Sequence, residues 1–165
     1  MIAVALAAGA VANAKSERNA SGVRAVSPPA AATNPCPLPR RYRKAFDAAV
    51  GDTDLPLALL VSVAQVESHL DSSARSLAGA KGLLQVMPST AAELRLDPDN
   101  VDSNVLAGAR YLRLMIDRFD SSNLALAAYN AGPGAVERSG GAPSGETLTY
   151  VANVNRLWQR LQGCS

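Results

Sequence analysis

A nearly uninterrupted run of apolar residues, from Leu55 to Val66, is the strongest pattern in this chain. Only two polar side chains interrupt the run. A helix that is apolar on almost all sides is typical of the middle of a folded domain. The pattern therefore predicts a central buried helix, with Asp54 as its N-cap, Pro56 in its first turn and Glu67 in its last turn.

Helical spacing of apolar residues continues through most of the remaining chain. Residues 71–86 depart from it and carry Gly79 and Gly82, so we expect a loop there, with at most a very small β-hairpin. The predicted fold class is therefore mainly α, in a single domain. The other helices are expected over Arg40–Val50, Pro88–Leu94, Asp102 or Ser103 to Phe119, Ser121 or Ser122 to Asn130, and Glu146–Leu161.

Several details of these helices follow from single residues. The helix that reaches Asn130 is expected to end at Gly132–Gly134, because glycine and proline commonly terminate helices. Tyr111 and Trp158 fall on apolar faces, and we assign both to the core. His69, the sole histidine, is expected to lie exposed beside the end of the central helix.

Length and composition are those of one ordinary globular domain. The chain has 165 residues, of which 48% are hydrophobic and 18% are charged, and its formal net charge is +2. This length accommodates one core with little left for a second domain. The small net charge gives no reason to expect a nucleic-acid partner.

The N-terminal residues resemble an export signal. Residues 2–12 are apolar, and Ala12-Asn13-Ala14 fits a small-residue cleavage site, so residues 1–14 are interpreted as a signal peptide, although no Lys or Arg precedes the apolar run. The run is too short for stable insertion in a membrane. Residues 15–35, rich in Ala, Ser, Asn and Pro, are predicted to be a flexible linker, and residues 36–165 the folded domain.

Two cysteines stand at the edges of the predicted domain. Cys36 opens it and Cys164 is the penultimate residue, so a bridge between them would join its two ends. Closing so long a loop contributes up to about 4–5 kcal/mol in the chain-entropy model. We favour the bridge over two unrelated thiols. A disulfide persists in oxidising compartments, which points to an exported protein that is periplasmic, cell-wall-associated or extracellular.

Glu67 is the leading candidate for chemistry. It is predicted in the last turn of an apolar helix, where the helix dipole disfavours a negative charge. Burial beside apolar walls would raise the pKa of its carboxyl, as a general acid that works near neutral pH requires. The alternative is a solvated glutamate at a helix end, which is the commoner situation.

Three segments together resemble the soluble lytic transglycosylases, a family related to goose-type lysozymes. The resemblance covers about residues 40–161 in the family's order and spacing, and Leu84 departs from it by replacing the usual Met, a change that conserves volume. The segments are Glu67-Ser68 with Ala74–Ser76 and Gly79–Ala91, then Ala127–Gly134, then Glu146-Thr147 with Tyr150-Val151. Asn104-Val105, Gly108, Tyr111 and Leu112 fit the helix that usually lies between the first two.

The resemblance implies a lysozyme-like helical domain with a substrate cleft. It also implies cleavage of the β-1,4 bond between N-acetylmuramic acid (MurNAc) and N-acetylglucosamine (GlcNAc) in peptidoglycan glycan strands. The C6 hydroxyl of the muramic acid attacks C1 and leaves a 1,6-anhydro end. Glu67 would serve first as general acid and then as base. We expect a monomer that uses no metal and no cofactor.

The resemblance also implies a set of substrate-binding residues, each with a plainer alternative. For Ser76 and Gln85 the alternative is ordinary loop polarity, and for Met87 it is core packing. For Asn130 it is helix termination, and for Glu146 it is a charge at a helix N-terminus. Tyr129 and Tyr150 would approach the sugar or Glu67 from two helices. The predicted substrate-binding residues are Ser76, Gln85, Met87, Tyr129, Asn130, Glu146 and Tyr150.

A single carboxylate agrees with this chemistry. Most glycosidases hold two acids about 5–10 Å apart, and substrate-assisted enzymes are among the exceptions. The nearest other acid in sequence, Asp71, is expected to cap the following loop. Two rival functions stay open: a hydrolytic muramidase on the same fold, and a non-catalytic wall-binding or secretion-apparatus component.

Overall fold

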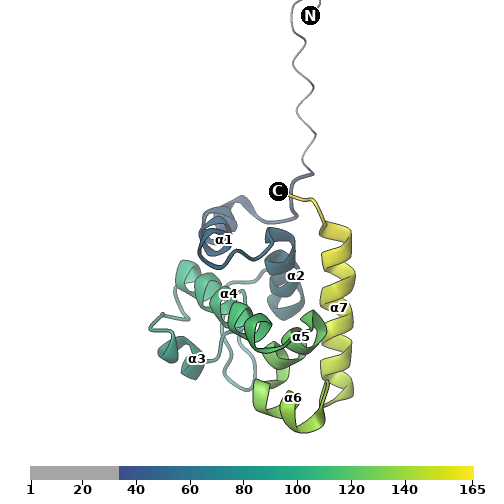
Figure 1. Ribbon diagram of the computed structural model, residues 1–165. Coiled ribbons are helices and arrows are strands. Elements are labelled where there is room, and N and C mark those ends of the chain that lie inside the picture. Colours follow the sequence, from purple (N-terminus) through teal and green to yellow (C-terminus); the bar gives the residue numbers. More distant parts are fainter. Residues whose placement is uncertain (1–33) are drawn as a thin grey trace, which may run out of the picture. The chain divides into compact units, whose positions relative to one another are not determined.

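The apolar run forms helix α2, Leu57–Ser68, at the centre of the domain. In the computed structural model, which describes residues 34–165, every residue of α2 from Ala58 to Ala64 is buried (Figure 1). The predicted central helix is confirmed, but its predicted cap is wrong. Pro56 is the N-cap of α2, and Asp54 instead ends the preceding helix in a left-handed conformation with φ of 56°.

Seven helices make up the described part of the chain, which confirms the mainly α fold class. Helix α4 packs on α1 and α5, while α7 packs on α2 and α5. Between α2 and α3 lies the cleft loop, residues 71–86, with isolated antiparallel bridges that join Lys81 to Arg75 and to Val86. The helices are α1 Arg40–Thr53, α2 Leu57–Ser68, α3 Pro88–Glu93, α4 Val101–Arg118, α5 Ser122–Ala131, α6 Pro133–Ser139 and α7 Gly145–Leu161.

Two helix starts differ from the sequence prediction. Helix α4 begins at Val101, and its N-cap is Asn100, whose side chain accepts a hydrogen bond from the Ser103 amide at 3.0 Å. Helix α5 ends at Ala131 with Gly132 as its C-cap, as predicted, but Pro133 also begins a helix that was not predicted, α6. Proline is well tolerated in a first helical turn because the amide that it lacks has no intrahelical partner there.

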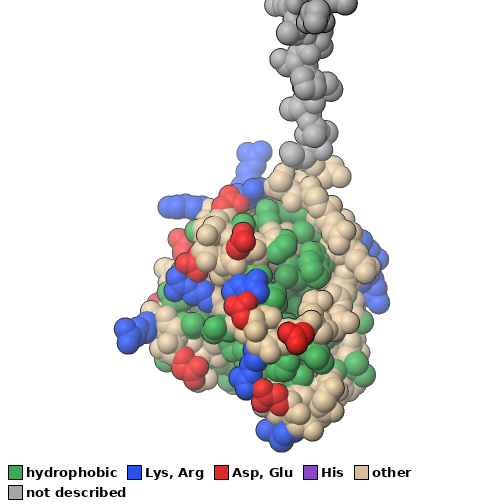
Figure 2. Space-filling model, in the orientation of Figure 1, with side chains coloured by type: hydrophobic (Ala, Val, Ile, Leu, Met, Phe, Trp, Pro, Cys, Tyr) green, Lys and Arg blue, Asp and Glu red, His purple; other side chains and the backbone are tan. Residues whose placement is uncertain are grey.

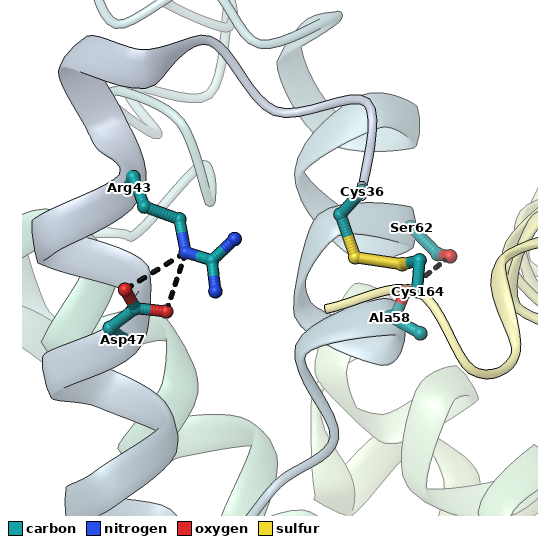
Figure 3. Close-up of a disulfide and its surroundings, with 6 residues drawn as sticks. All are labelled: Cys36, Arg43, Asp47, Ala58, Ser62 and Cys164. Carbon is teal, nitrogen blue, oxygen red and sulfur yellow. Dashed lines mark hydrogen bonds and ion pairs between the residues drawn. A yellow bond between two sulfur atoms is a disulfide. The ribbon is translucent and has the colours of Figure 1, made fainter. Parts of the chain in front are cut away.

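The predicted disulfide is confirmed and joins the two ends of the domain. Cys36 and Cys164 have Cα atoms 4.8 Å apart and lie 128 residues apart in sequence. The Ser165 amide also donates to the Asn34 carbonyl at 3.2 Å, so the last residue lies beside the first described one (Figure 1). Figure 3 shows that the bridge lies next to Ala58 and Ser62, in the N-terminal half of α2.

The predicted signal peptide, residues 1–14, and nearly all of the predicted linker lie outside the described residues. Within residues 34–165, none of the helices is both long and apolar enough to span a membrane.

Candidate active site

Glu67 lies in the last turn of α2 and is partly buried. Burial removes water from its carboxyl and raises the pKa to about 7, and an interaction with the Tyr150 hydroxyl opposes the shift. No other charged side chain among residues 34–165 contributes to this change. With a pKa of about 7, a substantial share of the Glu67 carboxyl groups is protonated at neutral pH.

Two tyrosines from different helices surround Glu67. Tyr129 on α5 and Tyr150 on α7 both have a pKa raised well above the ordinary value, first by burial and then by the charge of Glu67. The Tyr150 hydroxyl is buried, and no atom of residues 34–165 meets hydrogen-bond geometry with it. It is nevertheless close enough to Glu67 to lower the pKa of that carboxyl.

Tyr129 connects the acid to the cleft loop. Its hydroxyl donates a hydrogen bond of 2.7 Å to the Leu84 carbonyl. Its ring lies against that of Tyr111, with 5.4 Å between ring centroids. Because the hydroxyl is occupied by the backbone, Tyr129 is expected to present its ring, rather than its oxygen, to a ligand.

A cleft of about 270 Å³ opens beside Tyr129, and we call it the tyrosine cleft. It brings together four of the predicted substrate-binding residues: Gln85, Met87, Tyr129 and Asn130. Glu67 does not line it, although its charge acts on Tyr129. The remaining lining residues are Val86, Thr90, Tyr111, Ala131 and Gly132.

Gln85 is held by the cleft loop itself. It adopts a left-handed backbone conformation with φ of 43°, which is uncommon for a residue other than glycine. Its side-chain Nε2 donates to the carbonyls of Gly82 at 2.9 Å and Ala74 at 3.2 Å. The amide nitrogen therefore stabilises the loop, and the amide oxygen is left to accept a hydrogen bond from a ligand.

Three predicted substrate-binding residues do not line the tyrosine cleft: Tyr150, described above, Ser76 and Glu146. Ser76 is exposed, and its hydroxyl accepts a hydrogen bond from the Ala80 amide at 3.0 Å, which closes the turn of the cleft loop. Glu146 is exposed in the first turn of α7, with no hydrogen bond or ion pair to another of residues 34–165. Asp71 is likewise exposed and bonds to Ser73, in agreement with its expected capping role.

Sequence reasoning missed two hydroxyl residues that hold the site together. Ser68, next to Glu67, is buried, and its hydroxyl lies 2.9 Å from the Leu83 carbonyl. Thr147, next to Glu146, is buried and donates to the Asn130 side-chain oxygen at 3.0 Å. Both residues directly follow a glutamate in the segments that resemble the lytic transglycosylases. Their place in those segments was the signal in the sequence that could have identified them. Tyr111, which we had assigned to the core, is partly buried and lines the cleft.

A second hollow lies at the other end of α2, and we call it the apolar hollow. It measures about 340 Å³ and is lined mainly by apolar side chains from α2, α4 and α5, with Trp158 from α7. Figure 2 shows hydrophobic side chains gathered on this face of the molecule. Trp158 is only partly buried here and packs against the core from its edge.

No three His, Cys, Asp or Glu side chains among residues 34–165 are grouped as a metal ion would require. The arrangement is instead one proton-bearing carboxyl at a helix end, next to two tyrosines and a polar cleft. The seven helices that carry this site define a class of helical domain that is also found in solved lytic transglycosylase structures. The chain belongs to the transglycosylase SLT domain family, whose model matches residues 44–147.

Curated relatives carry the same family description in their names. The membrane-bound lytic murein transglycosylase F 2 of Alkalilimnicola ehrlichii is 39% identical over 105 residues, which cover 57% of this chain and 23% of that protein. The soluble lytic murein transglycosylase of Escherichia coli is 30% identical over 146 residues, covering 71% of this chain and 22% of that protein. The chain thus matches less than a quarter of the length of these relatives.

Solved structures show the same arrangement of helices. An inactive mutant of the lytic transglycosylase Slt from Pseudomonas aeruginosa superposes with a TM-score of 0.63 at 28% identity, covering 78% of this chain and 25% of that one. The 70 kDa soluble lytic transglycosylase from Escherichia coli gives a TM-score of 0.63 at 26% identity, covering 74% and 25%. The family resemblance inferred from the three sequence segments is confirmed.

Proposed function

We infer that this protein is a peptidoglycan lytic transglycosylase with Glu67 as its catalytic residue. The observation that carries the proposal is the carboxyl of Glu67, whose pKa burial raises to about 7. A general acid works best when its pKa lies near the operating pH. The bond cleaved is the β-1,4 linkage from MurNAc to GlcNAc, and the new glycan end is a 1,6-anhydro sugar.

The reaction needs one proton carrier. Protonated Glu67 donates its proton to the bridging oxygen as the bond from that oxygen to C1 of MurNAc breaks, which releases the GlcNAc hydroxyl. The resulting carboxylate then accepts the proton of the MurNAc C6 hydroxyl while that oxygen bonds to C1. Glu67 ends protonated, as it began, and no water is consumed.

The isolation of Glu67 from other charges supports this scheme over a two-acid mechanism. Asp71, the nearest acid in sequence, is exposed and held by Ser73. A second carboxylate beside Glu67 would appear as a further cause of its raised pKa, whereas burial is the only cause that raises it. Substrate-assisted glycosidases replace the second acid with a group of the substrate, here the C6 hydroxyl.

The tyrosine cleft is the proposed binding place for the sugar next to the scissile bond. Met87 and the ring of Tyr129 provide apolar walls, and the Gln85 amide oxygen and Asn130 provide polar contacts at its edge. Tyr150, with its buried and unpartnered hydroxyl, is proposed to donate to the substrate or to the Glu67 carboxylate once the proton has left. Ser76 and Glu146 are proposed to contact substrate from the exposed rim.

The disulfide supports an exported location. A bridge between Cys36 and Cys164 persists in an oxidising compartment, which is where peptidoglycan is also found. We propose that the protein acts there as a monomer on glycan strands, without nucleic acid, stable membrane insertion or cofactor.

The test is mass spectrometry of purified peptidoglycan after digestion with the protein. Muropeptides that end in 1,6-anhydro-MurNAc are the expected product, and Glu67→Gln is the matched control that should release none. Reducing MurNAc ends alone would identify a hydrolytic muramidase instead. Equal release of fragments by the parent and the Glu67→Gln variant would remove Glu67 from the mechanism.

A further inference from the structure

Asn104 is a deeply buried amide side chain near the cleft loop, and it does not line the tyrosine cleft. It lies in the first turn of α4 and is 1% exposed. A buried amide is costly unless its hydrogen bonds are made, so the partners of Asn104 show what it holds in place.

All three hydrogen bonds of the Asn104 side chain go to backbone atoms outside its own helix. Its Oδ1 accepts from the Leu84 amide at 3.0 Å, and its Nδ2 donates to the Lys81 carbonyl at 2.7 Å and to the Pro98 carbonyl at 3.1 Å. Both hydrogens of Nδ2 are therefore used. One side chain of α4 thus fixes residues 81–84 of the cleft loop and the turn before α4.

Two glycines allow the loop to sit this close to α4. A Cβ on Gly82 would lie 2.6 Å from the Asn104 amide nitrogen, and Gly82 also has φ of 73°. One helical turn after Asn104, a Cβ on Gly108 would lie 2.6 Å from Cδ1 of Leu84. Helix α4 therefore seats the loop at two points, a polar one at Asn104 and an apolar one at Gly108.

The carbonyls of residues 83 and 84, in the part of the loop that Asn104 holds, accept hydrogen bonds from residues near Glu67. The Ser68 hydroxyl, next to Glu67, shares its one hydrogen between the Leu83 carbonyl at 2.9 Å and the Ala64 carbonyl of its own helix at 3.0 Å. The Leu84 carbonyl receives the Tyr129 hydroxyl at 2.7 Å. Movement of residues 83 and 84 would thus displace both a neighbour of the acid and a wall of the tyrosine cleft.

We propose that Asn104 is a positioning residue for catalysis, which acts through the Leu83 and Leu84 carbonyls on Ser68 and Tyr129. This inference rests on the proposed function, since it assumes that Glu67 is the acid. Asn104 does not contact substrate. It holds the Leu84 carbonyl where that carbonyl accepts the Tyr129 hydroxyl, and Tyr129 lies near Glu67 and lines the tyrosine cleft.

The test compares three variants with a matched control. Asn104→Leu removes all three side-chain bonds, Asn104→Asp keeps only the acceptor for the Leu84 amide, and Gly108→Ala pushes Leu84 without changing Asn104. Asn100→Ala is the control, because it removes the N-cap of the same helix without touching the loop. Melting temperature, kcat and KM on purified peptidoglycan are measured for each.

We expect kcat to fall about tenfold to a hundredfold in Asn104→Leu and Gly108→Ala, since small displacements of a site have effects of this size. Asn104→Asp should lie between them and the parent. Asn100→Ala should lower the melting temperature and leave kcat unchanged. In Asn104→Leu the basic limb of the pH profile should also move to lower pH, because Glu67, which faces Tyr129 and Tyr150, becomes more hydrated.

Hydrogen exchange followed by mass spectrometry gives a readout that does not depend on activity. Residues 81–86 should exchange faster in Asn104→Leu and Gly108→Ala, and at the parent rate in Asn100→Ala. If Asn104→Leu does not fold, the other two variants decide. The proposal is overturned if the kcat values of Asn104→Leu and Gly108→Ala stay within twofold of the parent value. It is also overturned if Asn100→Ala loses as much kcat as they do, or if residues 81–86 exchange at the parent rate in both of them. Reducing MurNAc ends released by the parent would refute the proposed transglycosylase product. The kcat of each variant relative to the parent would still test the role of Asn104.

Discussion

The two ends of helix α2 differ in the groups that surround them. At the N-terminal end, Ala58 and Ser62 lie beside the Cys36–Cys164 bridge (Figure 3). Pro56 and Leu59, at the same end, line the apolar hollow of about 340 Å³. At the C-terminal end, Glu67 and Ser68 meet tyrosines, a backbone carbonyl and the polar tyrosine cleft of about 270 Å³. The N-terminal end thus lies among apolar side chains and beside a disulfide, whereas residues at the C-terminal end make hydrogen bonds to the cleft loop.

The difference separates stability from chemistry along one helix. Burying a carboxyl disfavours its charged form, so the C-terminal end lowers stability wherever Glu67 ionises. The bridge and the apolar packing at the N-terminal end offset that loss. Changes at the two ends should therefore affect either activity or stability, with little overlap.

The largest expected effect is the loss of activity in Glu67→Gln. Removing a general acid typically costs 10²- to 10⁴-fold in rate, and we expect a fall in kcat of about a thousandfold. The rate of muropeptide release from purified peptidoglycan measures it. The fold should be retained, since the amide has the size of the carboxyl. A fall of less than tenfold would contradict the assignment of chemistry to this end of α2.

The next largest effect is on stability, at the opposite end. Replacing both Cys36 and Cys164 by Ser opens a loop with a sequence separation of 128 and should lower the free energy of unfolding by about 4 kcal/mol. The melting temperature should fall by roughly 10 °C or more. At 25 °C, kcat should stay within twofold of the parent. A large loss of kcat in the folded variant would show that the two ends are coupled.

A pH-dependent difference in stability should also distinguish the ends. The folded pKa of Glu67, about 7, exceeds the ordinary value of 4.5. The contribution of Glu67 to the free energy of unfolding is therefore fully present below pH 4.5, and it is lost as the pH rises to about 7. Relative to Glu67→Gln, the parent should lose on the order of 2 to 3 kcal/mol across this window. Urea unfolding at pH 5 and pH 8 measures the change.

The control for this pH effect is internal. The pKa values of Asp52, Asp71 and Asp99 lie below their ordinary range, so these acids titrate at lower pH than the window in question. An equal difference between the parent and Glu67→Gln at pH 5 and at pH 8 would mean that Glu67 is ionised in the folded protein throughout.

The smallest expected effect comes from Tyr150→Phe. The buried hydroxyl has no hydrogen-bond partner among residues 34–165, so its removal should change the free energy of unfolding by less than about 1 kcal/mol. Tyr150 lowers the pKa of Glu67, so the variant should shift the basic limb of kcat, near pH 7, to higher pH. A pH–rate profile checks the direction, and a shift to lower pH would contradict the assigned interaction.

Much of this molecule could be predicted from local sequence. The apolar run of α2, the burial of Glu67 at its end and the mainly helical fold all follow from short-range patterns. The bridge between Cys36 and Cys164 was inferred from their positions at the two domain edges. The helix and the burial of its glutamate depend on the character of one segment, whereas the bridge could be inferred because only two cysteines are present and they stand at opposite edges of the domain.

The remaining features were decided by tertiary structure. Asp54 has the side chain of an N-cap, yet it ends α1, because the path of the chain between two packed helices requires a left-handed residue there. The bonds from Thr147 to Asn130, from Ser68 to Leu83 and from Asn104 to Leu84 join residues 17, 15 and 20 positions apart. Such contacts exist only after the helices have packed, so the sequence by itself determined the acid and its helix, and packing determined its surroundings.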